Sequence, residues 1–305
     1  MNITAKDVAA LRAKTGVGMM ECKKALVEAN GNEEEAIKIL RERGIAVAAK
    51  KSSRIAAEGI VDIAYCDKCD KAAIIEVNTE SDFAAKNEKF GAFVKDLLAV
   101  ILKNQPKDLD ALLKTDFNGN MDVEAAVKDK ILTVGENINI RRFQIVDGPV
   151  STYVHGKGTI GVIVKMSAKC DAPEFSEAAK NLALQIASMN PSYLDRDSVP
   201  ADVIANEKEV IAAQIKNDEA NAKKPEAVIE KMVTGKLNKF FSTNCLMHQE
   251  YVKEDNLTVE KYLEGVSKKL GVEVKPVCFI RYEKGEGLEK KNENFAEEIA
   301  KLTNK

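Results

Sequence analysis

The chain has 305 residues, enough for two or three domains with a sizeable core, and its 46 Lys and Arg against 48 Asp and Glu give a net charge of −2. This balance disfavours nucleic-acid binding, which usually requires a basic excess or a basic stripe. No apolar run approaches the ~20 residues of a membrane span, and the N-terminus lacks the apolar segment of a signal peptide. We therefore expect a cytoplasmic protein that contacts neither nucleic acid nor membrane.

Three short helices are predicted in residues 1–44. Thr4 is a helix N-cap, Gly16 breaks the first helix, and Gly44 is expected to end the third. Three helices in so short a segment resemble a ubiquitin-associated-type (UBA-like) bundle. The Ala-rich, polar stretch 45–57 has no clear amphipathic stripe and is expected to be a linker with helical tendency.

The pattern changes to strands at Glu58. Alternating apolar residues predict a hairpin whose turn contains Cys66 and Cys69, followed by an amphipathic helix and a further helix at about 122–134. This first unit is expected to span 58–137.

A second round of strands and helices is expected to begin at Ile138 and to fill 138–284. Two helices with apolar stripes and a polar break between them predict a protruding helical hairpin at 199–241. We expect an α+β fold of two related halves, each an antiparallel sheet covered by helices. A last strand is expected at 272–282, and a C-terminal module at 285–305 is expected to carry a last helix at 295–302.

A strand-to-helix corner follows the strand Ala72–Val77. Ser81 is a good N-cap, so Asp82 and Phe83 lie in the first helical turn, where an Asp suits the helix dipole. A bulky Phe at such a rim could project as a wedge beside a carboxylate. On physical grounds alone, the simpler alternative is that Phe83 belongs to the helix core.

Nucleotide-binding motifs do not fit the sequence. The run from Gly156 to Thr159 lacks the leading Gly of a phosphate-binding loop and precedes a strand, not a helix. We expect no direct nucleotide binding and no cofactor. Forty-eight carboxylates and two histidines, His155 and His248, suggest no catalytic constellation.

The Cys66-x-x-Cys69 pair could be half of a zinc site, but no second pair of ligands follows it. A redox pair would more typically open a helix after a strand. The six cysteines are scattered, so a disulfide framework is not expected. We interpret the pair as a polar turn that contains two thiols, and we expect no metal.

Three segments resemble the elongation factor Ts family. Glu76-Val77-Asn78 and then Ser81-Asp82-Phe83-Ala84 are similar to its core motif, in which Thr and Val replace Ser81 and Ala84. The run Leu11–Leu26 is a close match to the family's N-terminal signature, and 279–287 resembles its C-terminal segment.

The resemblance implies a guanine-nucleotide exchange factor, not an enzyme, whose partner is elongation factor Tu. It implies that Ser81, Asp82, Phe83 and Ala84 disturb the magnesium site of that GTPase. It further implies partner contacts by Met19, Met20, Lys23 and His155. A homodimer or a two-plus-two assembly stays open. Two other functions also stay open: a UBA-like adaptor, and a thiol or metal enzyme built on the Cys66 turn.

Overall fold

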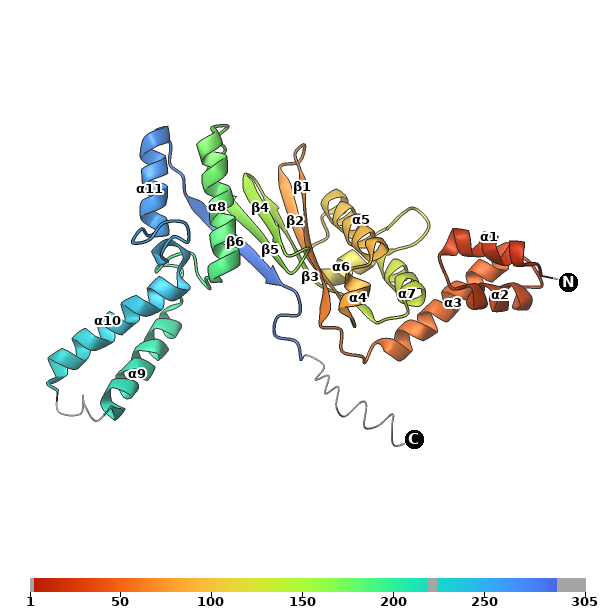
Figure 1. Cartoon of the computed structure of the whole chain (residues 1–305), viewed down its shortest axis with the longest axis horizontal. Helices are drawn as coiled ribbons and strands as arrows, with labels where there is room; N and C mark the ends of the chain where they lie inside the picture. The colour runs from red at the N-terminus through yellow and green to blue at the C-terminus, as the bar shows by residue number, and fades with distance from the viewer. Residues whose placement is uncertain (1–2, 219–223, 290–305) are drawn as a thin grey trace.

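The computed structural model describes residues 3–218 and 224–289 as helices packed with two three-stranded antiparallel sheets. The molecule is elongated, with the N-terminal helices at one end and a helical hairpin at the other (Figure 1). The helices are Ala5–Thr15 (α1), Met19–Glu28 (α2), Glu33–Lys51 (α3), Asp82–Ala85 (α4), Glu88–Asn104 (α5), Leu109–Leu113 (α6), Val123–Val134 (α7), Pro173–Met189 (α8), Ala201–Asn217 (α9), Glu226–Asn244 (α10), the 3₁₀ turn Leu246–His248 (η1) and Val259–Leu270 (α11). The strands are Glu58–Cys66 (β1), Lys71–Thr79 (β2), Ile138–Asp147 (β3), Val150–His155 (β4), Ile160–Met166 (β5) and Pro276–Glu283 (β6).

The N-terminal bundle of α1, α2 and α3 has a small core of its own. Thr4 and Asp7 form a capping box at the start of α1, as the sequence predicts. The predicted end of the third helix at Gly44 is wrong, because α3 continues to Lys51. Val47 and Ala48 pack into the core beneath the first sheet, and this packing outweighs the low helix propensity of one Gly. The UBA-like assignment stays a prediction.

The first sheet has the order β1-β2-β3, with β2 in its centre. Every residue of β2 after Lys71 is buried, because both faces of the sheet are covered. Ala73, Ile75 and Val77 pack with α5 on one face, whereas Ala72 and Ile74 face the second sheet, as the two-residue period of a strand requires.

The second sheet has the order β4-β5-β6 and is covered by α8 and α11. The prediction that the second half of the fold begins at Ile138 is wrong, because the strand that starts there, β3, belongs to the first sheet. β3 pairs antiparallel with β2, Ile138 lying opposite Thr79, so it completes the first sheet. The alternation of a sequence shows that a segment is a strand but does not show which strand will pair with it. The proposed domain boundaries otherwise stay predictions.

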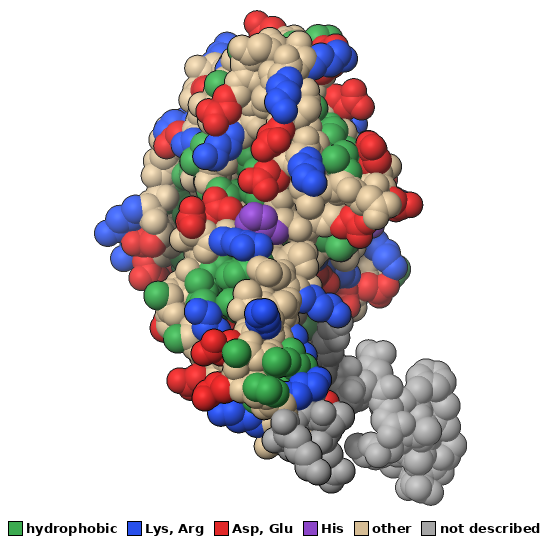
Figure 2. All heavy atoms as spheres, turned by 90° about the vertical axis from the view of Figure 1, so that its left-hand side faces the viewer, with side chains coloured by type: hydrophobic (Ala, Val, Ile, Leu, Met, Phe, Trp, Pro, Cys, Tyr) green, Lys and Arg blue, Asp and Glu red, His purple; other side chains and the backbone are tan. Residues whose placement is uncertain are grey.

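The helical hairpin of α9 and α10 extends away from both sheets (Figure 1). Its helices share a small apolar core that includes Ile211, Ile215, Leu237 and Phe241. On the face of the molecule at this end, acidic and basic side chains are interspersed (Figure 2).

Two further expectations concern the end of the chain. The last strand starts at Pro276, four residues later than the predicted Val272. The predicted helix at 295–302 lies outside the described residues. None of the helices in the described ranges is long and apolar enough to cross a membrane.

Candidate functional site

The corner after β2 presents Asp82 and Phe83 to solvent. Ser81 caps α4, and its Oγ accepts a hydrogen bond from the Ala84 N–H at 3.2 Å. Ala84 and Ala85 are buried against the sheet, whereas the Phe83 side chain is 81% exposed. One side of this short helix therefore rests on the core and the other carries Phe83 outward. The physical preference for a buried Phe83 was wrong, because the core side of the turn is occupied by the two alanines.

Glu136 fixes the backbone of this corner. Its carboxylate accepts hydrogen bonds from Thr79 Oγ1 at 2.9 Å, from the Ser81 N–H at 2.9 Å and from Ser81 Oγ at 2.6 Å. The next residue, Asn137, donates its N–H to Glu80 at 2.6 Å. The segment before β3 thus clamps the segment after β2. Sequence reasoning missed Glu136, since a single acidic residue between a helix and a strand gives no signal of its own.

Asp82 is an exposed carboxylate paired with Lys86, whose Nζ lies 2.6 Å from Asp82 Oδ2. The hydrogen bond and charge of Lys86 lower the pKa of Asp82, and Asp82 in turn raises the pKa of Lys86. Exposed pairs of this kind contribute little to stability. Asp82 is therefore ionised at neutral pH and is free to exchange Lys86 for another partner.

A groove separates this corner from the turn between β4 and β5. Asp82 and Lys86 line one side of the groove, and the turn 156–159 lines the other. The turn is anchored to the first sheet because the Val61 N–H donates to the Gly158 carbonyl at 2.8 Å. His155, at the start of this turn, is exposed, and its Nδ1 lies 2.9 Å from the Tyr153 hydroxyl. The structure therefore brings the His155 turn beside the Asp82 corner.

Met19, Met20 and Lys23 lie on α2 and are not brought together with Phe83, since α2 is in the bundle at one end of the molecule (Figure 1). Met20 is 65% exposed and Met19 is partly exposed. With Lys23 and Val27, Met20 lines a shallow hollow on this bundle.

Glu76 belongs to the same sequence motif as Asp82 and Phe83, but it lies inside the protein and stabilises the fold. Its side chain is fully buried, and its carboxylate receives hydrogen bonds from Arg142 Nε at 2.6 Å, Arg141 at 3.0 Å, Asn78 Nδ2 at 3.1 Å and the Gly285 N–H at 2.8 Å. Two arginines of β3 and the segment after β6 therefore meet at one carboxylate in the first sheet. This ion cluster links the first sheet to the segment that follows β6 of the second sheet.

The Glu76 cluster predicts a pH dependence of stability. Burial alone would raise the pKa of the Glu76 carboxyl, but the hydrogen bonds from Gly285, Asn78, Arg142 and Arg141 outweigh burial and lower the pKa. A carboxyl with a lowered folded-state pKa contributes stability above its unfolded value of about 4.3, and this contribution is lost as the pH falls through the folded value. We expect the difference in unfolding free energy between wild type and Glu76→Gln to shrink below about pH 4.3 in urea titrations. A difference that is constant between pH 7 and pH 3 would contradict this assignment.

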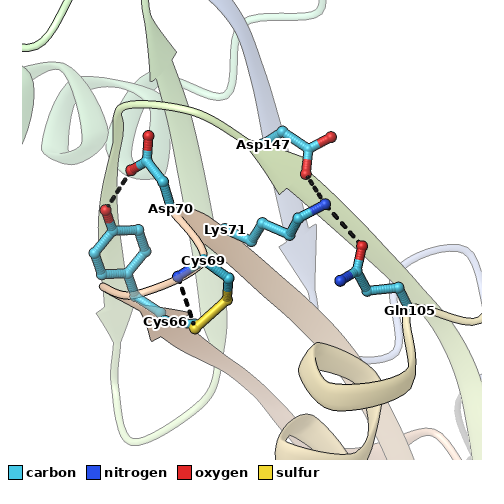
Figure 3. Close-up of a disulfide and its surroundings, with 7 residues drawn as sticks. Cys66, Cys69, Asp70, Lys71, Gln105 and Asp147 are labelled. Atoms are coloured by element: carbon cyan, nitrogen blue, oxygen red, sulfur yellow. Dashed lines mark hydrogen bonds and ion pairs between the residues drawn. A yellow bond between two sulfur atoms is a disulfide. The ribbon is translucent and has the colours of Figure 1, made fainter.

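The turn between β1 and β2 holds a disulfide between Cys66 and Cys69, whose Cα atoms are 5.5 Å apart (Figure 3). The expectation of two free thiols was wrong, because pairing of Cys66 with Lys71 in the hairpin brings the two cysteines within bonding range. The other four cysteines are free. No group of three or more metal-ligating side chains occurs within residues 3–218 and 224–289.

The Glu136 clamp predicts a measurable effect on the corner. In Glu136→Gln, the charged acceptor of the hydrogen bonds from Thr79 and Ser81 is lost, and the amide NH₂ keeps a hydrogen bond only if the Ser81 hydroxyl turns to accept from it. We expect a loss of about 1–2 kcal/mol in the free energy of unfolding, measured by urea denaturation. Glu209→Gln, on the exposed face of α9, is the matched control and should change stability by less than about 0.5 kcal/mol. Equal stability of the two variants would show that the clamp is not formed.

The chain is similar to a known protein family and to curated proteins over most of its length. Positions 80–286 match the elongation factor Ts family. The chain is 43% identical over 302 residues to elongation factor Ts of Clostridioides difficile (strain 630), with 98% of each chain covered. It is 44% identical over 308 residues to elongation factor Ts of Syntrophotalea carbinolica (strain DSM 2380 / NBRC 103641 / GraBd1), covering 99% of this chain and 100% of that relative. Elongation factor Ts proteins from Clostridium perfringens and Clostridium botulinum are likewise 40–42% identical to this chain. The chain belongs to the elongation factor Ts family.

Proposed function

We propose that this chain is a guanine-nucleotide exchange factor that binds elongation factor Tu in its GDP form and accelerates GDP release, so that GTP can replace GDP. The reaction involves no covalent chemistry. The observation that carries the proposal is Phe83, an aromatic side chain 81% exposed on a corner clamped by Glu136. Aromatic side chains that fill a partner's pocket are among the strongest contributors to binding.

The proposed mechanism is coupling between two binding events. Tight nucleotide binding by a GTPase depends on a phosphate cradle and on Mg²⁺ that bridges the phosphates. Phe83 inserts between elements of the GTPase, and Asp82 displaces elements of its magnesium site without becoming a lasting ligand. A factor that weakens nucleotide binding is itself released by nucleotide with the same free energy.

The fixed geometry of the corner supports this role. A wedge distorts its partner only if the wedge deforms less than the partner does. The Ser81 cap, the buried Ala84 and the three hydrogen bonds to Glu136 hold the corner in one conformation. Asp82 and Phe83 thus make the proposed contact with the GTPase. Ser81 and Ala84 hold these two residues in place from the side of the core.

Further contacts are proposed for Met19, Met20 and Lys23 on the bundle and for His155 beside the groove. All four are at least partly exposed. Their role is to add contact area whose binding energy supports the distortion at the nucleotide site. A one-to-one complex, a homodimer and a two-plus-two assembly with Tu are all compatible with this proposal.

Isothermal titration of the full chain into purified Tu tests the coupling. We expect nucleotide-free Tu to bind about 5- to 150-fold more tightly than Tu bound to GDP and Mg²⁺, because the coupling free energy between linked sites is typically 1–3 kcal/mol. Equal affinity for the two forms would contradict exchange activity. No binding to either form would favour the UBA-like adaptor alternative.

A further inference from the structure

The β1–β2 turn lies far from the corner that carries Phe83. Cys66 and Cys69 precede the first residue of β2, and Ser81 follows its last residue. Nine residues of extended strand separate the two ends by about 30 Å. The disulfide therefore has no part in the proposed exchange mechanism, and the inference drawn from it does not depend on that mechanism.

The turn keeps its shape through interactions other than the disulfide (Figure 3). The Tyr65 hydroxyl donates to Asp70 Oδ1 at 2.7 Å, and the Asp70 carbonyl accepts from the Gly148 N–H at 2.8 Å. Lys71 Nζ lies 2.6 Å from Asp147 and 2.7 Å from Gln105. Since these contacts hold both strands at their ends, opening the disulfide leaves the two sulfur atoms next to each other.

The closed loop is also too short to stabilise the fold much. The stabilisation that a disulfide provides grows with the number of residues it encloses, and this one joins positions only three apart. A structural role is therefore a poor explanation for this bond.

The two sulfur atoms differ in their surroundings. The Cys69 N–H donates to Cys66 Sγ at 3.2 Å, whereas no hydrogen bond to Cys69 Sγ is recorded within the described residues. A hydrogen bond to sulfur stabilises the thiolate form, so Cys66 is the better leaving group when the disulfide is attacked. The intervening Asp67 and Lys68 are exposed, and both cysteines are partly exposed. An incoming thiolate can therefore reach Cys69.

We propose that Cys66 and Cys69 form a reversible redox-modification site that exchanges two electrons with dithiols. A thiolate of the dithiol attacks Cys69 Sγ, forms a mixed disulfide and expels the Cys66 thiolate. The second thiolate of the dithiol then attacks the sulfur of its own first thiol and expels the Cys69 thiolate. The dithiol is oxidised to its disulfide, its two protons end on Cys66 and Cys69, and the chain gains two electrons.

The neighbouring thiol selects for dithiols over monothiols. After a monothiol attacks Cys69, the Cys66 thiolate lies next to the mixed disulfide and reverses the step. A dithiol carries its own second thiol at high effective concentration and completes the reduction before that reversal. The substrate class is therefore a protein or small-molecule dithiol.

The test counts thiols in the folded full-length chain. The protein is equilibrated with ratios of reduced to oxidised dithiothreitol, quenched in acid, denatured, alkylated and weighed by mass spectrometry. We expect a two-electron transition from four to six alkylated cysteines, with the added label on Cys66 and Cys69 and an unchanged circular dichroism spectrum. At equal thiol concentration, 2-mercaptoethanol should reduce the pair at least about tenfold less.

Two variants and one rate measurement complete the test. Cys170→Ser should keep the transition with one label fewer, whereas Cys69→Ser should abolish it. The folded chain should be reduced at most about tenfold more slowly than the chain in urea, because both cysteines are partly exposed in the folded chain. Slower reduction than that, loss of sheet signal on reduction, or equal reduction by the monothiol would overturn the proposal. GDP release should be the same in both redox states; a change would show that the site is coupled to exchange and would overturn its independence.

Discussion

Phe83→Ala is expected to slow the stimulated release of GDP from elongation factor Tu by about 30-fold or more, which corresponds to the loss of about 2 kcal/mol at a binding hot spot. The side chain is 81% exposed and contributes little to the core of this chain. Its removal should therefore leave the free energy of unfolding within about 0.5 kcal/mol of wild type. Stopped-flow fluorescence gives the rate, and urea denaturation gives the stability.

Val277→Ala is the matched control for Phe83→Ala. Val277 is a large apolar residue on β6 that is 49% exposed, and no role in partner binding is proposed for it. The control variant should release GDP at the wild-type rate. A slow Val277→Ala variant, or a fast and folded Phe83→Ala variant, would show that the corner does not act as the wedge.

Glu76→Gln is expected to have the largest effect on stability. The substitution keeps the volume of the side chain but leaves the charges of Arg141 and Arg142 without their shared carboxylate. Removing one partner of a buried ion pair costs about 3–5 kcal/mol, and the partial exposure of both arginines reduces this to about 2–3 kcal/mol. Urea denaturation at pH 7 measures the difference in unfolding free energy.

Glu124→Gln serves as the control for that substitution. Glu124 lies 2.6 Å from Lys128 in an exposed pair on α7, so its loss should cost less than about 0.5 kcal/mol. The Glu76 variant should also bind Tu more weakly when part of it is unfolded at the assay temperature. Equal stability of the Glu76 and Glu124 variants would mean that the buried cluster contributes nothing net to folding.

The sequence predicts most elements of this fold because each has a local signal. Caps such as Thr4 and Ser81 mark helix starts, and the period of apolar residues distinguishes β2 from α5. The end of the third helix is predicted wrongly at Gly44, because the packing of α3 beyond this residue outweighs the low helix propensity of Gly. The sheet to which β3 belongs is predicted wrongly, because strand pairing depends on two segments that are distant in sequence.

In the candidate site, too, features with a local sequence signal are predicted and those that depend on distant segments are not. Asp82 and Phe83 are located by the corner motif, but the outward direction of Phe83 depends on Ala84 and Ala85 filling the space beneath it. Glu136 reaches the corner from a segment 55 residues away from Ser81, so local reasoning could not find it. The same holds for the buried cluster of Glu76, whose partners come from three separate segments.

Exchange activity is measured by stopped-flow release of a fluorescent GDP analogue from purified elongation factor Tu, with and without this chain. We expect the wild-type chain at saturating concentration to accelerate GDP release by about 100-fold, because a coupling free energy of about 3 kcal/mol that acts wholly on the release rate corresponds to that factor. We also expect Phe83→Ala to remove most of this acceleration. Unchanged GDP release in the presence of a folded chain that binds Tu would show that the chain is not an exchange factor for Tu.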